Sequence, residues 1–480
     1  MRLVYVHEPR IGAKVKRIPL LFSLFFLMSP AQSVEASGLS GPPQPAGLLE
    51  SEPAAQVVEI GPGSIALTRQ EIDSLIYPKP GARLHFPSLD RYTANEQTGL
   101  EFTRINVFAP NAKIRVMSQE GIEFLAPDRR DFYLASNTTT GIGIAVDPDT
   151  GEVRGFINRQ GSKLEIKGNI IGQLQLSSIV EPQAASNSCG TELSGQPLDI
   201  QQKLVNPAFR SASAAEAGEL ISYEAVVAID TDNEWLDGFN DNTTTAMNWI
   251  TDIFLAMNVF YERDVETRLL IGDVTLRTGS DDPYTVPSDR VAQLNEFGAY
   301  WKDNMGAVER QFAAMLSGRI SSSYGFSGIA WVDQFCEYGR SWGTQTPGSF
   351  SYNAIGYNRT AGNTAIYLGH EIGHNMGSPH THCYNPPVDS CYNAGGSSCY
   401  TGTPECPNGG SGRGTIMSYC HVNNSNGAGC GTSNSEFHPT VQSLIEGNLA
   451  AELAAGCILP YNQQPPDDDS IFSEGFESTP

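Results

Sequence analysis

The sequence predicts a mostly β domain followed by an α/β domain. Short β-type runs separated by turn residues occupy residues 57–180. Strand-like runs alternate with amphipathic segments of helix length from residue 223 to residue 376. Small and polar residues fill 181–218, and we place the linker between the two domains at 201–219.

The N-terminus has the three-part order of a secretory signal peptide. Basic residues between Arg10 and Arg17 precede an apolar run from Ile18 to Met28, and small residues follow up to Ala36. The apolar run is too short to span a bilayer, so we expect residues 1–36 to be a signal peptide, the protein to be secreted and extracellular, and no membrane anchor. The chain has 480 residues and a net charge of −23, which disfavours nucleic acid and anionic membranes as partners.

The first domain is expected to be mostly β from about residue 57, within a segment that we bound at 37–200. Residues 37–56 are rich in Pro, Gly, Ser and Ala and are interpreted as a flexible leader. Ile142–Val146 and Val153–Ile157 flank the turn residues Asp147–Gly151, which predicts a hairpin.

The second domain is bounded at 220–460. We predict strands at Tyr223–Ile229, Thr267–Leu276 and Gly328–Phe335. Apolar residues three and four apart predict two helices before residue 363, and Ser288 and Asp289 are placed to cap the second. The residues of the two faces are Met247, Ile250, Phe254, Met257, Phe260 and Tyr261, and then Val291, Leu294, Phe297, Trp301, Met305, Val308, Phe312 and Met315.

A loop-rich lobe with disulfides is expected after the α/β core. Six of the nine cysteines lie between Cys383 and Cys430, in sequence rich in Gly, Asn and Ser. A last amphipathic helix, from Val441 to Leu453, ends before Gly456. Residues 461–480 are predicted to form a disordered acidic tail.

The strongest chemical signal is a cluster of histidines. His370 and His374 lie four residues apart in a predicted helix, so both imidazoles can reach one ion from one face. Gly377 permits a left-handed turn that would bring His380 to the third position. Three neutral nitrogens leave zinc one open position, as a catalytic zinc requires. The alternative is an ordinary helix with buried or surface histidines, but the full His-Glu-x-x-His-x-x-Gly-x-x-His pattern rarely arises by chance.

A second signal follows downstream. Thr415–Tyr419 reads Thr-Ile-Met-Ser-Tyr, where the extended histidine motif expects a methionine turn beneath the metal. A lone Met417 would more often be core filler.

With these motifs, residues from about Leu220 to Leu459 resemble a metzincin peptidase of the adamalysin or reprolysin family. Further points of resemblance are Asn375 after the second histidine, the segment Gly328–Cys336 and the ending Gly456–Leu459. The resemblance implies a twisted, mostly parallel five-stranded sheet with long helices and a disulfide-rich lower lobe. It also implies a zinc-dependent endopeptidase that is made as a zymogen, and it makes residues 37–200 a propeptide.

The chain departs from the reprolysin pattern at three places. Thr381 replaces an aspartate after the third histidine and is followed by His382, a minor rival to His380 as the ligand. The Met-Ser-Tyr turn is similar to that of astacins and serralysins, so Tyr419 is a candidate zinc ligand or transition-state donor, and a buried structural tyrosine is the alternative. Of the family's calcium positions Glu224 fits, but Gln311 and Pro460 do not, so Ca²⁺ is left open without an assigned site.

The expected chemistry is peptide hydrolysis by one catalytic Zn²⁺. Zinc would polarise the scissile carbonyl and activate water, and Glu371 would act as the general base. Protein or peptide substrates would pair with Gly328–Phe335 as an added strand, and the protein is expected to be a monomer. Two alternatives stay open: an inactive binding protein that keeps the fold, and a zinc amidase acting on cell-wall peptides.

The odd number of cysteines leaves one to explain. Ser188-Cys189-Gly190 resembles the segment by which reprolysin propeptides silence their enzymes, so Cys189 is a candidate fourth zinc ligand. The eight remaining cysteines suffice for four disulfides, and the family resemblance implies a pair between Cys336 and Cys457. The alternative, a disulfide from Cys189 to the catalytic half, stays open because connectivity cannot be read from sequence.

Overall fold

The structure is a computed structural model. It describes residues 63–76, 83–92, 100–137, 139–159, 162–179, 189, 222–279, 282–320, 327–355, 360–410, 412–431 and 433–461. All of them belong to one compact unit, residues 57–480. The predicted signal peptide, the leader, the linker and nearly all of the acidic tail lie outside the described residues. Among the described residues, no helix has the length and apolar character needed to cross a membrane.

The first domain is built on an antiparallel sheet of eight strands in the order β1-β10-β9-β8-β7-β6-β3-β2. The long hairpin formed by β7 and β8 lies at the predicted place, around Asp147–Gly151. One face of the sheet packs against α1. The core between them includes Tyr133, Ile142 and Ile166. The elements are β1 (Gly63–Ala66), α1 (Arg69–Ile76), β2 (Arg83–His85), η1 (Pro87–Tyr92), β3 (Glu101–Ile105), β6 (Asp131–Ser136), β7 (Thr140–Val146), β8 (Glu152–Arg159), β9 (Ser162–Asn169) and β10 (Gln173–Ser178).

The second domain is built on a twisted sheet in the order β14-β15-β13-β11-β12. The strands are β11 (Tyr223–Thr231), β12 (Thr267–Arg277), β13 (Phe312–Ser317), β14 (Ser327–Ala330) and β15 (Phe350–Ala354). Four of them are parallel, and β14 is an antiparallel edge strand. A short strand, β18 (Leu459–Pro460), pairs with the start of β11.

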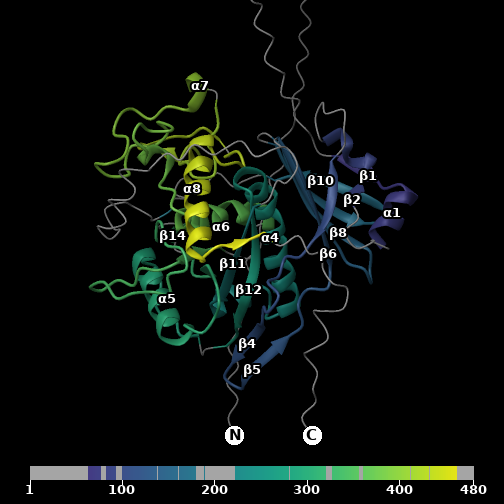
Figure 1. Ribbon diagram of the computed structural model, residues 1–480, viewed down its shortest axis with the longest axis horizontal. Helices are drawn as coiled ribbons and strands as arrows, with labels where there is room; N and C mark the ends of the chain where they lie inside the picture. Colours follow the sequence, from purple (N-terminus) through teal and green to yellow (C-terminus); the bar gives the residue numbers. More distant parts are fainter. Residues whose placement is uncertain are drawn as a thin grey trace, which may run out of the picture. The chain divides into compact units, whose positions relative to one another are not determined.

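Helices cover both faces of this sheet (Figure 1). Ala225, Val227 and Ile229 of β11 join the core formed with α4 (Thr243–Val265), α6 (Ala361–Asn375) and α8 (Pro439–Ala455). Ala228 points to the other face and packs with α5 (Arg290–Asn304). Because successive side chains of a strand point to opposite faces, β11 is buried on both sides.

Two parts of the predicted secondary structure are wrong. The helix capped by Asp289 ends at Asn304, and Phe312–Ser317 is strand β13 instead of two further helical turns. All six residues of β13 are buried, so no alternation marks it as a strand. The predicted strand Gly328–Phe335 is shorter, Ser327–Ala330, and β15 was not predicted.

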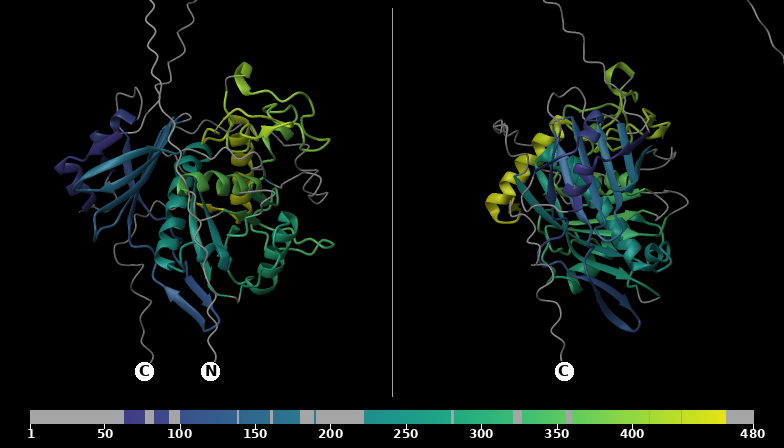
Figure 2. Two further views of the ribbon diagram at one scale, coloured as in Figure 1. Left: turned by 180° about the vertical axis from the view of Figure 1, so that it is seen from behind. Right: turned by 90° about the vertical axis from the view of Figure 1, so that its right-hand side faces the viewer.

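The first domain also contributes to the second sheet, which the expectation of five strands did not include. The hairpin of β4 (Ile114–Ser118) and β5 (Gly121–Leu125) extends the sheet beyond β12. β4 pairs with β12 in parallel, from Ile114 opposite Val274 to Met117 opposite Arg277. This hairpin and the two sheets are visible from further sides in Figure 2.

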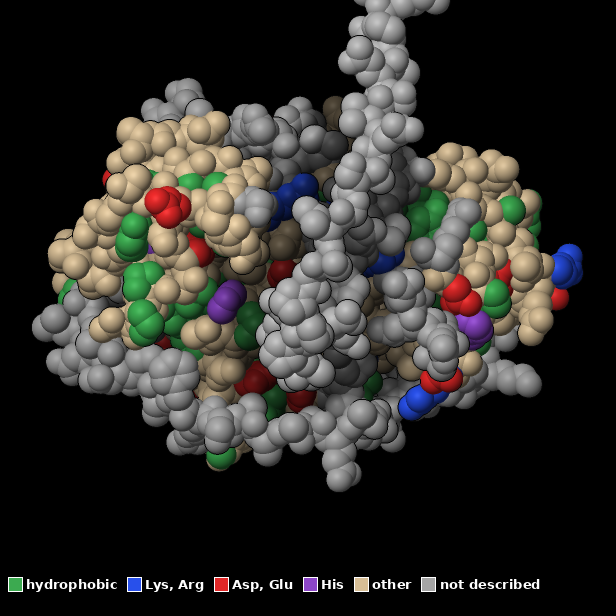
Figure 3. All heavy atoms as spheres, turned by 90° about the horizontal axis from the view of Figure 1, so that it is seen from above, with side chains coloured by type: hydrophobic (Ala, Val, Ile, Leu, Met, Phe, Trp, Pro, Cys, Tyr) green, Lys and Arg blue, Asp and Glu red, His purple; other side chains and the backbone are tan. Residues whose placement is uncertain are grey.

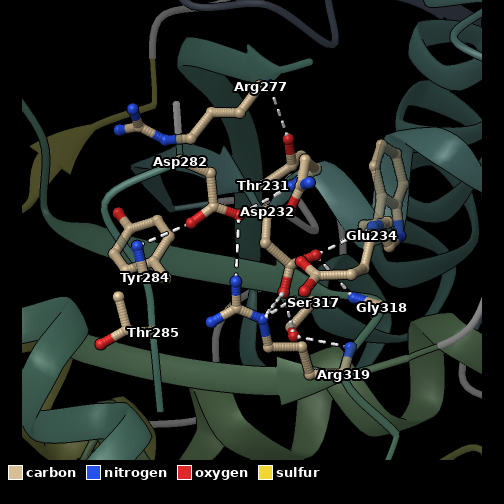
Figure 4. Close-up of polar contacts among 12 residues, drawn as sticks. Thr231, Asp232, Glu234, Arg277, Asp282, Tyr284, Thr285, Ser317, Gly318 and Arg319 are labelled. Atoms are coloured by element: carbon tan, nitrogen blue, oxygen red, sulfur yellow. Dashed lines mark hydrogen bonds and ion pairs between the residues drawn. The ribbon is translucent and has the colours of Figure 1, made fainter. Parts of the chain in front are cut away.

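A buried ionic cluster fixes the C-terminal ends of β11 and β13 (Figure 4). The Asp232 carboxylate accepts hydrogen bonds from the Trp235 N–H, which caps α3 (Asn233–Asp237), and from the Gly318 N–H at 2.8 Å. Arg319 lies 3.8 Å from Asp232 and contacts Glu234 at 2.9 Å. Burial raises the pKa of Asp232 to about 7, against the lowering effects of the Gly318 N–H and Ser317.

The lower lobe after His380 contains little regular structure and is held by disulfides. Its elements are η3 (Thr381–Cys383), α7 (Pro407–Gly410), β16 (Asn423–Asn424) and β17 (Gly427–Ala428). Its three disulfides are Cys383–Cys399, Cys391–Cys420 and Cys406–Cys430, and a fourth, Cys336–Cys457, ties the end of α8 to the upper part. Basic side chains are few on the face drawn in Figure 3, in keeping with the acidic composition.

Candidate metal centre

Helix α6 carries the first two histidines. Thr360 caps its N-terminus by accepting a hydrogen bond from the Asn363 N–H. His370 and His374 lie four residues apart on the buried side of the helix, 8% and 0% exposed. A separation of four residues places both rings on one face.

The chain reverses after α6 at Gly377. This residue has φ of 100°, which a side chain would strain, and a Cβ there would lie 2.2 Å from the Asn448 amide nitrogen. That nitrogen donates to the Met376 carbonyl at 3.0 Å. Gly377 therefore permits both the turn and the contact with α8, and the turn brings His380 beside the other two histidines.

The three Nε2 atoms converge. His374 Nε2 lies 3.1 Å from His370 Nε2 and 3.1 Å from His380 Nε2. Nitrogens bound to one zinc at 2.0–2.1 Å with tetrahedral angles would lie about 3.3 Å apart. The spacing of the three rings therefore fits zinc.

Hydrogen bonds at the opposite ring nitrogens orient two of these histidines. His370 Nδ1 lies 2.6 Å from the Ile416 carbonyl oxygen, and His374 Nδ1 lies 2.7 Å from the Ser378 carbonyl oxygen. A carbonyl only accepts, so each Nδ1 carries the proton and each Nε2 presents a lone pair. Burial lowers the pKa of His370 to about 4 and holds those of His374 and His380 well below the usual value, so all three are neutral at pH 7.

The segment around Met417 lies beneath this cluster. Met417 is fully buried, and a Cβ on Gly373 of α6 would lie 2.7 Å from its sulfur. Its carbonyl accepts from the Thr381 N–H at 3.0 Å. Since the Ile416 carbonyl also orients His370, this turn supports two of the three histidine positions.

Glu371 lies on the other side of the cluster, against strand β14. A Cβ on Gly328 would lie 2.2 Å from Glu371 Oε1, so any larger residue here would displace the Glu371 side chain. The pKa of Glu371 is raised to about 8 by burial, against the lowering effect of a hydrogen bond with Cys189. The contact between Gly328 and Glu371 was not predicted, because it depends on how α6 docks on β14.

Cys189 comes from the first half of the chain and lies in the same site. Its Sγ and the ring nitrogens of His370, His374 and His380 all lie within 4.8 Å of one another. The Cys189 thiol is 3.2 Å from Glu371 Oε2, and its residue is 8% exposed. The Tyr419 hydroxyl donates to the Cys189 carbonyl oxygen, and the Tyr419 ring lies 4.3 Å from that of His380.

A small pocket of about 30 Å³ opens beside these groups. It is lined by Cys189, His370, Glu371 and Tyr419 together with residues of β14, α6 and the lower lobe. Ile366, Tyr367, His421 and Ser433 also line it and were not predicted as site residues. No motif marks them, since they meet only in the folded chain.

His382 does not converge with the four groups. Its ring stacks on His380 at 5.4 Å with an interplanar angle of 7°, on the side of Tyr392. This arrangement favours His380 over His382 as the third ligand.

Both polar atoms of the Gln311 side chain make hydrogen bonds within the protein, so they do not favour a calcium site there. The Gln311 side-chain oxygen accepts from the Val226 N–H at 2.7 Å, and its nitrogen donates to the Cys457 carbonyl at 2.8 Å. The amide is therefore engaged at both ends.

Comparison with known proteins identifies the family of the second domain. Residues 223–428 match the family model Reprolysin_5, described as metallo-peptidase family M12. No curated protein matches the chain.

Two solved structures show distant similarity. Metalloproteinase-II from Bacteroides fragilis is 11% identical with a TM-score of 0.30, over 60% of this chain and 79% of its own. A structure titled as a chaperone–substrate complex is 11% identical with a TM-score of 0.26, over 61% of this chain and 38% of its own. Similarities this weak add nothing to the assignment, which rests on the family match and the histidine cluster. Residues 223–428 thus form a reprolysin-like M12 metallopeptidase domain, in which His370, His374 and His380 are placed to hold zinc.

Proposed function

We propose that this chain is the latent precursor of a secreted zinc endopeptidase, silenced by Cys189. The observation that carries the proposal is the convergence of the Cys189 thiol with three histidine nitrogens within 4.8 Å. A thiolate is a strong zinc ligand at about 2.3 Å, and it would take the one coordination position that the histidines leave to water.

His370, His374 and His380 would hold the ion. Zinc in such a site supplies Lewis-acid chemistry, polarising a carbonyl and lowering the pKa of a water molecule to about 7. Glu371 is adjacent in sequence to a ligand, and its carboxylate would take the proton of the attacking water and pass it to the departing amine. Gly328 would keep that carboxylate against β14.

The peptide substrate would enter along β14. This strand is antiparallel to β15 and lies at the edge of the sheet. An extended peptide can add to such an edge through main-chain hydrogen bonds. Tyr419, which bonds the Cys189 carbonyl in the precursor, would be released with Cys189 and could then donate to the oxyanion of the substrate.

The same segment would silence the enzyme in two further ways. The Cys189 thiol contacts the proposed base, Glu371, at 3.2 Å. The Cys189 carbonyl holds the proposed oxyanion donor, Tyr419. The other eight cysteines pair in four disulfides, so Cys189 keeps its thiol. Secretion, with removal of residues 1–36, is supported by these disulfides, which persist in oxidising compartments.

The test compares the purified full chain with Cys189→Ala and Cys189→Ser variants on a casein or gelatin substrate. The wild-type chain should be latent and should be activated by a mercurial or by cleavage on both sides of Cys189, within residues 181–218. Both variants should be active without either treatment, because alanine and serine replace the thiolate ligand. A variant that remains as latent as the wild type, with unchanged zinc content, would refute the switch.

A further inference from the structure

Helix α4 is buried on both of its sides. One side packs on β12 and α6 of the peptidase domain, and the other packs on β6, β7 and β8 of the first domain. A Cβ on Gly143 in β7 would lie 2.9 Å from the Leu255 side chain, and one on Gly141 would lie 2.6 Å from Val259. The backbone of β7 therefore lies directly against the helix, with glycines where side chains would prevent the approach.

The apolar contacts across this boundary form one continuous core. Phe132, Leu134, Ala145 and Phe156 of the first sheet belong to the same buried cluster as the residues of α4. The cluster also contains Ile114 and Val116 of β4. Loss of the first domain would expose this surface of α4 to water, and burial is the dominant favourable term in such contacts.

A polar network joins the same two elements. Arg130 lies just before β6, and its guanidinium donates to Asp252 at 2.8 Å, to the Asn248 carbonyl at 2.9 Å and to Thr251 at 2.6 Å. The Thr251 hydroxyl also donates to Asp128 at 2.6 Å. The side chains of Arg130 and Asp252 are 7% and 5% exposed, so these bonds are shielded from water.

Two further contacts extend the boundary. Asn158 donates to the Ser435 carbonyl at 2.6 Å, and Lys163 donates to the Ser433 carbonyl at 3.0 Å, both from buried side chains of the first sheet to the lower lobe. At the edge of the peptidase sheet, β4 pairs with β12. Beside this pair the Lys113 N–H donates to the Asp273 carboxylate at 3.0 Å. Without β4, β12 would become an exposed edge strand, a template for unwanted pairing.

We propose that the first domain, residues 63–179, is a permanent subunit of the peptidase and stays bound after activation. Cuts between residues 179 and 222 would release only the short segment that carries Cys189. The interaction surface is the outer side of α4 with the edge of β12, and its partner is this chain's own first domain. This inference rests on the proposed activation by cleavage, but the contact itself does not depend on zinc or on catalysis.

The test uses the full chain with Glu371→Ala, which prevents self-digestion, and with two sites for a specific protease inserted at 181–186 and 200–206. After both cuts, the two large fragments should elute together in size-exclusion chromatography at low micromolar concentration. Separate elution, with a catalytic fragment that is monodisperse and unfolds at the same temperature as the cut complex, would overturn the proposal. Activity of the uncut chain with Glu371 intact, measured separately, would bear only on the Cys189 switch.

Matched variants locate the contact. Arg130→Ala should raise the dissociation constant of the fragments at least tenfold, whereas Arg83→Ala should leave it unchanged, because Arg83 pairs with the exposed Glu101 of the same domain. Gly143→Leu should also weaken the complex, and Gly63→Leu in β1 should not, because the nearest atom to a Cβ there is at an ordinary 3.6 Å. Fragments that stay together equally well with Arg130→Ala and Gly143→Leu would show that this surface does not hold them.

Discussion

At the scale of single residues, Glu371 is the side chain on which the proposed chemistry depends. It follows His370 directly but points to β14, where the absence of a Cβ at Gly328 leaves room for its carboxylate. It is assigned to proton transfer and not to metal ligation.

Glu371→Ala should therefore keep about one zinc per chain and lower proteolysis by at least two orders of magnitude, on the scale of losing a general base. His370→Ala is the contrasting variant, because it should lose zinc and activity together. Zinc content and the rate of peptide hydrolysis are measured on the same cleaved samples of both variants. Full activity in the Glu371→Ala variant would remove Glu371 from the mechanism.

A second prediction concerns the hydroxyl of Tyr419. If its hydroxyl donates to the oxyanion, Tyr419→Phe in the activated enzyme should lower kcat by about one to three orders of magnitude with little change in KM. Tyr392→Phe is the control, since its ring packs on Tyr419 at 4.8 Å. An unchanged kcat would leave Tyr419 as a packing residue.

The histidine positions could be predicted from the sequence because their geometry is local. A separation of four residues on one helix and a glycine turn bring the three rings together, and surrounding carbonyls then orient two of them. The carbonyl of Ile416, the space at Gly328 and the pocket residue His421 could not be predicted, because each is brought to the site by tertiary packing.

At the scale of elements, the end of β11 carries a pH-dependent contribution to stability. The folded-state pKa of Asp232, about 7, lies above its ordinary value of 3.8. The contribution of this group is thus fully present below about pH 4 and is lost as the pH rises through 7. Asp232→Asn, which keeps an oxygen to accept from Gly318, removes this titration.

Relative to the wild type, Asp232→Asn should gain unfolding free energy between about pH 5 and pH 8, the range over which the wild-type carboxyl loses its proton. Urea denaturation at the two pH values, both in the Glu371→Ala background, measures the difference. A difference between the two proteins that is the same at both pH values would contradict the assignment.

The disulfides differ in the length of chain that each one closes. Cys336–Cys457 closes a sequence separation of 121 residues, and Cys406–Cys430 closes one of 24. In the chain-entropy account, removing the longer link should cost about 1.4 kcal/mol more unfolding free energy than removing the shorter one. Urea denaturation of the two double alanine variants gives both values, and an equal or reversed order would count against this account.

The prediction of secondary structure failed at strand β13. Met305, Val308, Phe312 and Met315 have helical spacing, yet the last two lie in β13. A strand buried on both faces has no polar alternation, so its apolar residues can match a helical period by accident. The sheet position of β13, between β11 and β15, decides its conformation and is not visible in a local pattern.

At the scale of the whole molecule, the sequence indicated a β part followed by an α/β part, whereas the described residues belong to one compact unit in which the two parts share structure. The β runs and the linker composition mark a separate domain. The hairpin of β4 and β5 nevertheless joins the peptidase sheet, and Phe132 and Phe156 join its core. Such sharing depends on contacts between residues far apart in the chain, such as Arg130 and Asp252, for which the sequence carries no local signal.

X-ray absorption at the zinc edge of the intact, latent chain reports directly which atoms bind the metal. Silencing by Cys189 predicts three nitrogen ligands at about 2.0–2.1 Å and one sulfur ligand at about 2.3 Å. In Cys189→Ala the sulfur contribution should disappear and be replaced by a light atom, with zinc still bound by His370, His374 and His380. A latent wild-type chain whose zinc has only nitrogen and oxygen ligands would contradict the account.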